Sequence, residues 1–505
     1  MTVTAHRPRP SGARRHLLEA ALADLRDDFQ ELLFLCRSAR AALDEAEVEL
    51  SAARLHSPTR ALLAAELATS RRRYAGARQS LLRLRERAKR ELPSRSLVDR
   101  LAEEKAALSD RLRTEQALLA ALVSAADWQS PSFLHSLAPA AGRQEGRILP
   151  HWNDYKRDRH LDAERHERLY LEEMVDGPTE LRALFTSCGM AAFTTILSFL
   201  SLEGRLEGPV IAGAGLYHES RLLLERTLRD RVSFLDERDT RGLLRAIENL
   251  EPRAIFLDSL SNTSRMPVPE LGPLLERLRG RECYLVLDNT GLSVACQPFS
   301  LAGDSVRLLV FESLLKYPQL GLDRTNAGVI VAREDDAELL QEYREHLGTN
   351  IADVAVYALP RPERAVLERR LARLERNALF LATRLEVRSA PSAEIVYPGL
   401  PSHPCARAAA ELPFRGACFS IVFPERGAEL AHERALVEAA VSEAAKRGVA
   451  LLAGSSFGFD TTRIYLTAAR AEYGEPFVRV AAGTEHRLAL EPLAEALSAA
   501  VEAVS

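Results

Sequence analysis

The spacing of apolar residues changes along the chain, and the change separates three regions. Between residues 12 and 126, apolar side chains such as Leu25 and Phe29 recur every three or four positions, which is the spacing of one helix face. Pro58 and Pro93 interrupt the pattern, and a proline inside a helix removes a hydrogen bond. We therefore expect three long helices, near residues 12–55, 59–91 and 96–126.

The predicted helices suggest a helical hairpin or a three-helix bundle that packs on itself or on a second subunit. A solvated spacer is the alternative. Acidic and basic residues alternate along the segment, so its charges are interpreted as a solvated face. We find no candidate for chemistry in it, and residues 1–11, rich in proline and arginine, are expected to be a disordered tail.

From Leu184 onward, short apolar runs alternate with helical segments rich in Arg, Glu and Leu. Such alternation predicts a mostly parallel sheet covered by helices. A long helical stretch then begins near Pro362, and a mixture of strands and helices follows from about Ile395. The strands expected in the first sheet lie at 210–212, 254–257, 284–287, 308–311 and 328–332.

Composition narrows the class of protein. A chain of 505 residues is too long for one hydrophobic core, so we expect two or three domains. The net charge of −4 with mixed signs disfavours a nucleic-acid partner. The six cysteines are scattered without metal-ligand spacing, which suggests reduced thiols in a cytoplasmic protein and no metal site. Neither a signal peptide nor a membrane-spanning run is expected.

Two residues at the ends of buried strands suggest a specific chemistry. Asp288 ends the apolar run that begins at Cys283, and Lys316 follows the run that begins at Val306. Enzymes that use pyridoxal phosphate (PLP) need a lysine to hold the cofactor aldehyde and a carboxylate to keep the pyridine nitrogen protonated. A lone aspartate at the end of a strand is more often a cap or turn residue, and a lone lysine is more often solvated. The neighbouring motifs therefore decide whether these two residues bind a cofactor.

Three further segments fit this chemistry. A small-residue turn around Gly189 leads into a helix, whose first N–H groups can cradle a phosphate, although a plain helix cap would look the same. Tyr217 could stack on a cofactor ring or belong to the core. The strand that begins at Phe256 ends in polar residues up to Asn262, at the sheet edge where α/β proteins bind ligands.

From about Asn153 to its C-terminus, the chain resembles the Cys/Met-metabolism family of fold-type I PLP enzymes, which includes cystathionine γ-synthase, cystathionine lyases and methionine γ-lyase. Seven motifs occur in the order of that family. They are Tyr155-Lys156-Arg157, Cys188-Gly189-Met190-Ala191-Ala192, Tyr217, the 258–262 strand end, Asp288-Asn289-Thr290, the 313–317 segment with Lys316, and the 477–485 segment with Arg479.

The resemblance implies an α/β fold-type I PLP-dependent transferase with a smaller C-terminal α+β domain, here preceded by an all-α bundle or coiled coil. It also implies domain boundaries. We expect the extension at 12–128, a linker and dimer-contact arm at 129–183, the PLP-binding domain at 184–360, and a connecting helix with the small domain at 361–505.

The resemblance assigns roles to individual residues. Lys316 would form the Schiff base and act as catalytic base, with Tyr217 and Tyr155 as further catalytic residues. Arg479 and Ser456 would bind the substrate carboxylate. The expected cofactor-binding residues are Lys316, Asp288, Cys188, Gly189, Met190, Tyr217, Asn262 and Ser313, together with Tyr155 and Arg157 reaching the cofactor phosphate of a neighbouring subunit.

The implied activity is γ-elimination or γ-replacement on an amino acid that carries a leaving group on Cγ. A β-lyase acting on cystathionine- or cysteine-like substrates, or a catalytically reduced scaffold, is the alternative. Leu315 replaces the family threonine, Cys188 replaces a serine, and the sequence after Tyr317 departs from the family pattern, which indicates a divergent member. The expected partners are an amino-acid substrate and further copies of the chain, at least a dimer and by resemblance a tetramer.

Overall fold

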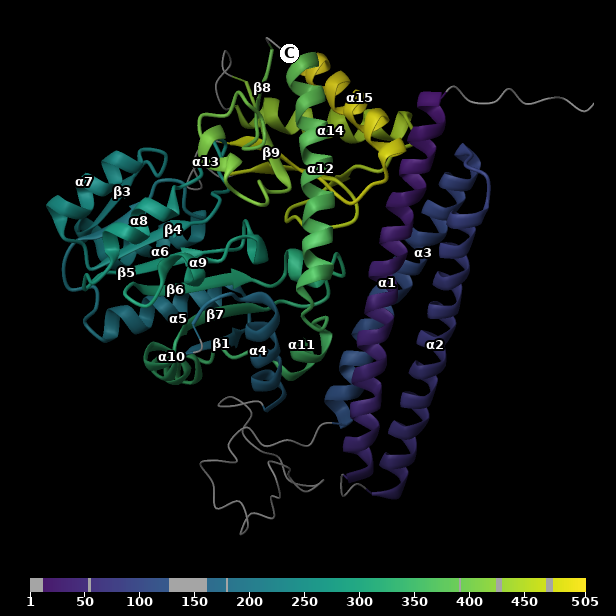
Figure 1. Ribbon diagram of the computed structural model, residues 1–505, viewed down its shortest axis with the longest axis horizontal. Coiled ribbons are helices and arrows are strands. Elements are labelled where there is room, and N and C mark those ends of the chain that lie inside the picture. Colours follow the sequence, from purple (N-terminus) through teal and green to yellow (C-terminus); the bar gives the residue numbers. More distant parts are fainter. Residues whose placement is uncertain are drawn as a thin grey trace, which may run out of the picture.

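The computed structural model describes residues 12–52, 56–126, 161–178, 180–389, 392–423, 429–468 and 476–505. Three long helices stand beside a body that contains two sheets (Figure 1). The long helix α12 (Arg364–Ser389) runs from the large sheet region to the small one and faces the three helices. The three N-terminal helices, the alternating strands and helices, and the final mixture of both occur in the expected order along the chain. The expected domain boundaries stay a prediction.

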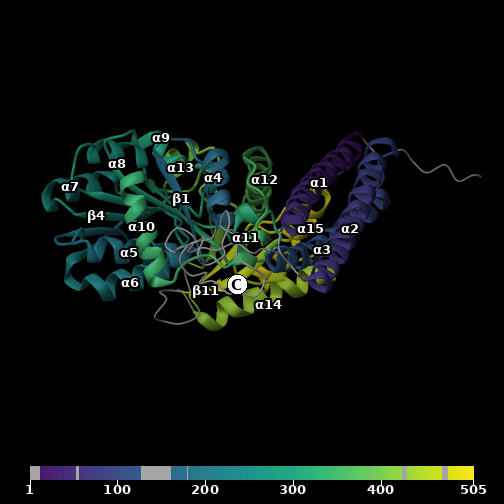
Figure 2. The ribbon, with the colours of Figure 1, turned by 90° about the horizontal axis from the view of Figure 1, so that it is seen from below.

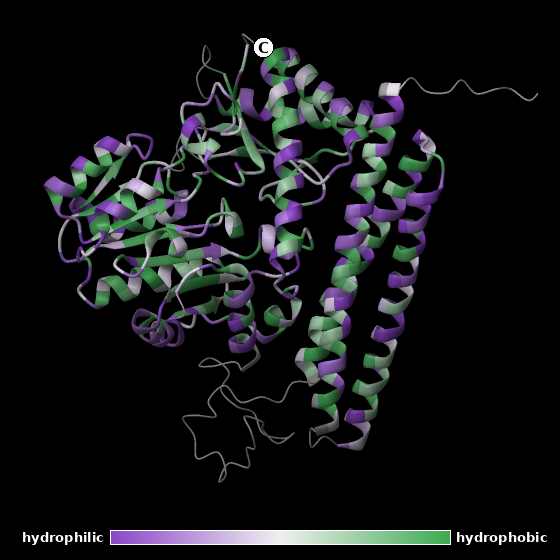
Figure 3. Ribbon diagram, viewed as in Figure 1, coloured by the Kyte–Doolittle hydropathy of each residue, from purple (hydrophilic) through white to green (hydrophobic). Residues whose placement is uncertain are grey.

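The N-terminal helices are α1 (Gly12–Ala52), α2 (Ser57–Arg90) and α3 (Arg95–Ala126). Pro58 lies in the first turn of α2, where proline costs no helical hydrogen bond, and Pro93 separates α2 from α3. Apolar and polar residues alternate along each of the three helices (Figure 3). Their buried apolar residues belong to one hydrophobic core, so the predicted three-helix bundle is confirmed. Its buried core includes Leu25, Phe29, Leu67, Leu81, Leu101 and Leu119.

The bundle also packs on the rest of the chain. Helix α3 contacts α11 (Asp353–Ala358), and α1 contacts α15 (Arg487–Val504), an arrangement visible in two orthogonal views (Figures 1 and 2). The alternative of a solvated spacer is therefore wrong. The expected solvated charged face is wrong in part as well, because Asp24 is 3% exposed and faces arginines of α12.

The large sheet has seven strands in the order β1-β7-β6-β5-β4-β2-β3. Strands β2 to β6 run parallel, and β7 is antiparallel to both β6 and β1. The mostly parallel sheet predicted from strand–helix alternation is thus confirmed. The strands are β1 (Leu181–Thr186), β2 (Val210–Gly213), β3 (Val232–Leu235), β4 (Ala254–Asp258), β5 (Tyr284–Asp288), β6 (Arg307–Ser313) and β7 (Gly328–Arg333).

Helices cover both faces of this sheet, because neighbouring side chains of a strand point to opposite faces. Phe256 and Phe311 pack against one group of helices, and Leu257 and Val310 against the other. The first group is α5 (Gly189–Leu202), α6 (His218–Leu228) and α10 (Glu334–Leu347). The second is α4 (Leu161–Met174), α7 (Thr240–Leu250), α8 (Leu271–Leu278) and α9 (Pro298–Ala302).

The small sheet has the order β10-β11-β12-β9-β8 and is antiparallel except for the pair β10–β11. Its strands are β8 (Glu394–Val396), β9 (Cys418–Val422), β10 (Leu452–Ala453), β11 (Arg463–Thr467) and β12 (Phe477–Ala481). The remaining helices are α13 (Ala406–Ala410), α14 (Leu430–Lys446) and the single turns η2 (Arg229–Arg231), η3 (Ser293–Ala295) and η4 (Tyr317–Gln319). Within the described ranges, no helix is both long and apolar enough to span a membrane.

Candidate active site

The candidate site lies at the carboxyl ends of the central strands of the large sheet. Asp258 ends β4 and Asp288 ends β5, and the two are paired in register. Ser313 ends the neighbouring strand β6, and Lys316 follows three residues later. Parallel strands bring their carboxyl ends to one edge, so the sequence motifs that follow these strands meet there.

Lys316 is largely buried, and its amine contacts the loop between β10 and β11. Its Nζ donates a hydrogen bond to Ser456 Oγ at 2.7 Å and lies 5.2 Å from the ring centroid of Phe457. Burial and the charge of Arg479 lower the pKa of Lys316 to about 8, although the nearby Asp288 opposes the shift. Because the neutral amine is the nucleophile and the base, this environment prepares Lys316 for either role.

We expect the reactivity of Lys316 toward an amine-modifying reagent to titrate near pH 8 in the cofactor-free protein. A lowered pKa means that the neutral, reactive amine dominates above about pH 8 and the ammonium below it. The rate of labelling, followed by mass spectrometry of the peptide that contains Lys316, measures this directly. A midpoint of labelling near pH 10, the range of an ordinary lysine, would contradict the expected shift.

Asp288 is fixed by Thr290. The Thr290 N–H donates to Asp288 Oδ1 at 2.9 Å, and the Thr290 hydroxyl oxygen accepts from the Ser313 N–H at 2.9 Å. Burial raises the pKa of Asp288 to about 6, while its bonds to Thr290 and the charge of Lys316 limit the rise. The carboxyl is therefore mostly ionised at neutral pH and can pair with a protonated ring nitrogen.

A second carboxyl, Asp258, accompanies Asp288. Burial raises its pKa well above the usual range, and the charges of Asp288 and Glu237 add to this. Its Oδ2 accepts from the Tyr217 N–H at 3.0 Å, whereas Oδ1 has no hydrogen-bond partner among the described residues. Tyr217, which is 40% exposed, immediately precedes α6 at its N-cap position. From the sequence, Asp258 was named only as part of the 258–262 strand end. Glu237 was missed, because a single acidic residue outside any motif does not stand out in a sequence.

The start of α5 lies against the end of β6. Cys188 caps the helix, because its Sγ accepts a hydrogen bond from the Ala191 N–H at 3.3 Å. A Cβ on Gly189 would lie 2.8 Å from Ser313 Cβ, so only glycine permits this approach. Met190 occupies the first turn, and its Sδ accepts from Ser220 Oγ at 3.8 Å. The N–H groups of this turn and the Ser313 hydroxyl are hydrogen-bond donors of the kind that hold a phosphate.

Replacing Gly189 with alanine is expected to weaken PLP binding by about tenfold, since the new methyl group must displace Ser313 or the helix start at a cost of about 1–3 kcal/mol. Equilibrium dialysis of PLP against the purified variant measures the change. Gly272→Ala is the matched control, because a Cβ there meets nothing within 4 Å. Equal PLP affinity in the two variants would show that the cradle is elsewhere.

Arg479, a residue of the small sheet, lies at the same edge of the large sheet. It lies in β12, is 6% exposed, and donates from Nη1 to Asn262 Oδ1 at 2.8 Å. Its Nε has no hydrogen-bond partner in the described part of the chain, and its guanidinium lies 5.8 Å from the Phe457 ring centroid. A buried guanidinium with an unused donor favours a bound carboxylate. Phe457, which contacts both Lys316 and Arg479, was not singled out from the sequence.

The structure thus brings together Lys316, Asp288, Tyr217, Asn262, Ser313, Arg479, Ser456 and the turn 188–190. Tyr155 and Arg157 lie outside the described residues, so their placement stays a prediction. Within the described ranges, no cluster of three or more His, Cys, Asp or Glu side chains could hold a metal ion.

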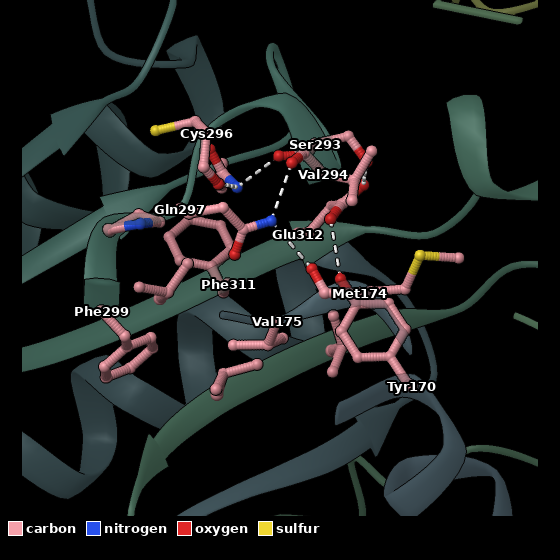
Figure 4. A pocket seen from close by; sticks show the side chains of 15 residues that line it. Tyr170, Met174, Val175, Ser293, Val294, Cys296, Gln297, Phe299, Phe311 and Glu312 are labelled. Carbon is pink, nitrogen blue, oxygen red and sulfur yellow. Dashed lines mark hydrogen bonds between the residues drawn. The ribbon is translucent and has the colours of Figure 1, made fainter. Parts of the chain in front are cut away.

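A separate pocket lies against strand β6, beside α4 (Figure 4). Glu312 accepts hydrogen bonds there from Ser293 Oγ at 2.6 Å and Tyr170 Oη at 2.8 Å, and burial raises its pKa to about 7. None of the residues that line this pocket was predicted as a site residue. The Glu312 carboxylate is already satisfied by its two donors, so we assign it a structural role.

Comparison with curated proteins gives distant relatives. The bifunctional enzyme flvA of Aspergillus flavus is 26% identical over 345 residues, 66% of this chain. The chain spans only 41% of the length of that protein. A probable cystathionine gamma-synthase of Herpetosiphon aurantiacus is 28% identical over 230 residues, which is 44% of this chain and 67% of the relative.

Solved structures share the fold. Cystathionine gamma synthase from Xanthomonas oryzae pv. oryzae has a TM-score of 0.57 and 22% identity, covering 70% of this chain and 89% of its own. A methionine gamma lyase from Micromonospora echinospora has a TM-score of 0.56 and 23% identity, covering 71% and 94%. The fold predicted by resemblance, fold type I preceded by a helical region, is therefore confirmed.

A sequence profile decides the family. The profile described as "Cys/Met metabolism PLP-dependent enzyme" matches residues 128–491, which is well over half of the chain and includes all seven motifs. The predicted cofactor, PLP, follows from this match. The chain belongs to the Cys/Met-metabolism family of PLP-dependent enzymes.

Proposed function

We propose that the protein catalyses γ-elimination or γ-replacement on an amino acid with a leaving group on Cγ. The observation that carries the proposal is the enclosed Lys316 amine, which contacts Ser456 and Phe457; Phe457 also contacts Arg479, and the charges of Arg479 and Asp288 both act on the pKa of Lys316. Such an arrangement provides a base, a counter-ion for the cofactor ring and a carboxylate anchor in one place.

The residues present fit PLP. Asp258 Oδ1 and Arg479 Nε are buried polar atoms without hydrogen-bond partners among the described residues, and Gly189 lets the start of α5 approach Ser313 more closely than a side chain would allow. Lys316 would hold the aldehyde and Asp288 the ring nitrogen, while Tyr217 and Asn262 would contact the ring. The cradle residues, Cys188, Gly189, Met190 and Ser313, would hold the phosphate, and the bound cofactor would supply the electron sink.

The remaining steps of the reaction are assigned to individual side chains. Arg479 would hold the α-carboxylate of the substrate through paired N–H donors, a geometry that lysine does not offer. Ser456 would add a hydrogen bond beside it. Lys316, once free, would take the proton from Cα and return protons later, and loss of a second proton at Cβ would expel the group on Cγ.

β-Elimination would use the same residues, and the geometry does not favour it over the γ-reactions. The names of the relatives support the γ-reactions, since they describe a cystathionine gamma-synthase, a cystathionine gamma-lyase and a methionine gamma lyase. A scaffold without activity would have no use for the Lys316, Asp288 and Arg479 constellation, so we set that alternative aside.

The test supplies the PLP-loaded protein with homoserine esters, methionine, cystathionine and cysteine in turn, and identifies each keto acid together with released ammonia. The proposal predicts 2-oxobutyrate from substrates with a γ leaving group, or a γ-substituted product when a thiol is added. Pyruvate as the sole keto acid would establish β-elimination instead. No product and no exchange of the Cα proton with any of the four would favour the scaffold.

We also propose that the active form is at least a dimer, and a tetramer by family resemblance, with Tyr155 and Arg157 serving the cofactor of the neighbour. Mixing two inactive variants, Lys316→Ala and Arg157→Ala, tests this assignment. In a two-fold dimer with sites shared across the interface, random mixing should restore about one quarter of the activity. Recovery near zero would place Arg157 in its own subunit's site. A cytoplasmic location stays a prediction.

A further inference from the structure

One side of helix α3 contacts two loops that flank the candidate active site. Lys105, Ser109 and Arg113 are spaced four residues apart and so share a helix face. Lys105 Nζ lies 2.7 Å from Asp460 Oδ2, and the Ser109 hydroxyl donates to the same oxygen at 3.2 Å. Arg113 donates to the Gly321 carbonyl oxygen at 2.9 Å, in the loop that follows Lys316.

The loop that contains Asp460 also contacts the active-site amine. Ser456 accepts the hydrogen bond from Lys316, and Phe457 lies beside both Lys316 and Arg479. Ser456 has φ +71°, a left-handed conformation that is costly for a residue with a side chain and that surrounding contacts must maintain. The position of Ser456 and Phe457 therefore depends on what holds the rest of the loop.

Helix α12 holds this loop from a second side. Arg370, whose side chain is 1% exposed, donates to Asp460 Oδ1 at 2.8 Å and to the Gly458 carbonyl oxygen at 2.9 Å. Glu31 of α1 pairs with Arg370 at 2.6 Å. Removing one member of such a buried charged cluster leaves the others without compensation, which is costly.

Asp460 lies at the centre of this cluster and is held in its ionised form. Burial opposes ionisation of Asp460, but Lys105 and Arg370 together hold the pKa of Asp460 well below its usual range. The side chain of Lys105 is only 12% exposed, and Asp28 lies 3.9 Å from its amine. The Asp460 carboxylate therefore stays ionised at neutral pH. Its ion pair with Lys105 links the N-terminal bundle to this loop.

We propose that the N-terminal bundle positions the active site, with Lys105 as the positioning residue that acts through Asp460 on Ser456 and Phe457. The bundle would thereby set how the substrate carboxylate is held beside Arg479. This inference rests on the proposed roles of Lys316 and Arg479. The competing explanation, a contact that only stabilises the fold, predicts no selective effect on the loop.

Hydrogen–deuterium exchange on the full-length chain tests the inference without reference to activity. In Lys105→Met, amides of residues 454–461 should exchange at least about tenfold faster, the change expected from loss of one charged hydrogen bond. Strand β9 should keep its exchange rate. Lys89→Met, the same change at an exposed lysine of α2, should leave both regions unchanged, and Lys105→Arg should restore most of the protection. Unchanged exchange in the loop, or equal acceleration throughout the chain, would overturn the proposal.

Steady-state kinetics of the PLP-loaded protein supply the second readout. Lys105→Met should raise KM by about tenfold while kcat changes by less than about threefold, because the proposal assigns this loop to holding the substrate carboxylate beside Arg479. Ser109→Ala, a milder change at the same contact, should shift KM in the same direction and covers the case in which Lys105→Met does not fold. An equal fall of kcat with unchanged KM in both variants would overturn the positioning role, whereas failure of all activity in the wild type would concern only the proposed function.

Discussion

Replacing Lys316 with alanine should lower kcat/KM by at least about 10³-fold, because the variant loses both the covalent anchor and the base. The effect should appear in kcat, since Arg479 and Ser456 still hold the substrate. The variant should also lose the visible absorbance that a lysine-bound cofactor gives, while retaining some PLP through the cradle around Gly189. Steady-state kinetics and a spectrum of the PLP-loaded variant measure the two effects.

Lys89→Ala is the matched control for this change, because it removes the same side chain from an exposed position of α2. It should leave kcat/KM and the absorbance unchanged. If Lys316→Ala kept the absorbance and more than about one tenth of the activity, another amine would have to be the anchor, and the proposed role of Lys316 would be wrong.

Replacing Asp288 with asparagine should lower kcat by about 10²- to 10³-fold, the usual cost of removing one preorganised charge from an active site. Asparagine preserves the shape and can keep the bond from the Thr290 N–H, so the loss reports the charge. PLP binding by the cofactor-free wild type should weaken as pH falls through about 6, where the Asp288 carboxyl takes up a proton. Kinetics at pH 8 measure the change in kcat, equilibrium dialysis of PLP between pH 5 and pH 8 measures the change in binding, and the variant should lack this pH dependence.

Asp239→Asn is the control for Asp288→Asn. Asp239 caps α7 by accepting from the Gly242 N–H at 2.8 Å, and asparagine caps a helix as well as aspartate does. The control should therefore keep both stability and activity. Should Asp288→Asn match the control in kcat, a charge at position 288 would be unnecessary and the assignment of Asp288 to the ring nitrogen would fail.

The sequence predicted the central strands, which are short and wholly apolar. The strands expected at 254–257 and 284–287 are β4 (Ala254–Asp258) and β5 (Tyr284–Asp288). Strands β1, β3, β8 and β10 were not predicted. β1 (Leu181–Thr186) crosses the boundary expected between residues 183 and 184, β3 is only partly buried, and β8 and β10 have three and two residues. Such short or half-exposed strands give no pattern that can be distinguished from a loop.

The candidate site was predictable where a motif and a strand end coincide, as at Asp288 and Lys316. Asp258 and Asp288 meet because parallel strands share an edge. Contacts between segments that are far apart in the sequence could not be predicted in this way. The pair of Asp460 with Lys105 joins positions 355 residues apart, and a lysine on a helix rich in charges looks solvated until the partner is placed opposite it.

The central claim is that one amine of this chain, at Lys316, binds PLP covalently at the edge of the large sheet. Borohydride reduction of the PLP-loaded protein, followed by mass spectrometry of its peptides, tests the claim most directly. We expect a pyridoxyl group fixed on Lys316 at about one per chain. A label found chiefly on other lysines, or no fixed label on a protein that binds PLP, would contradict the account.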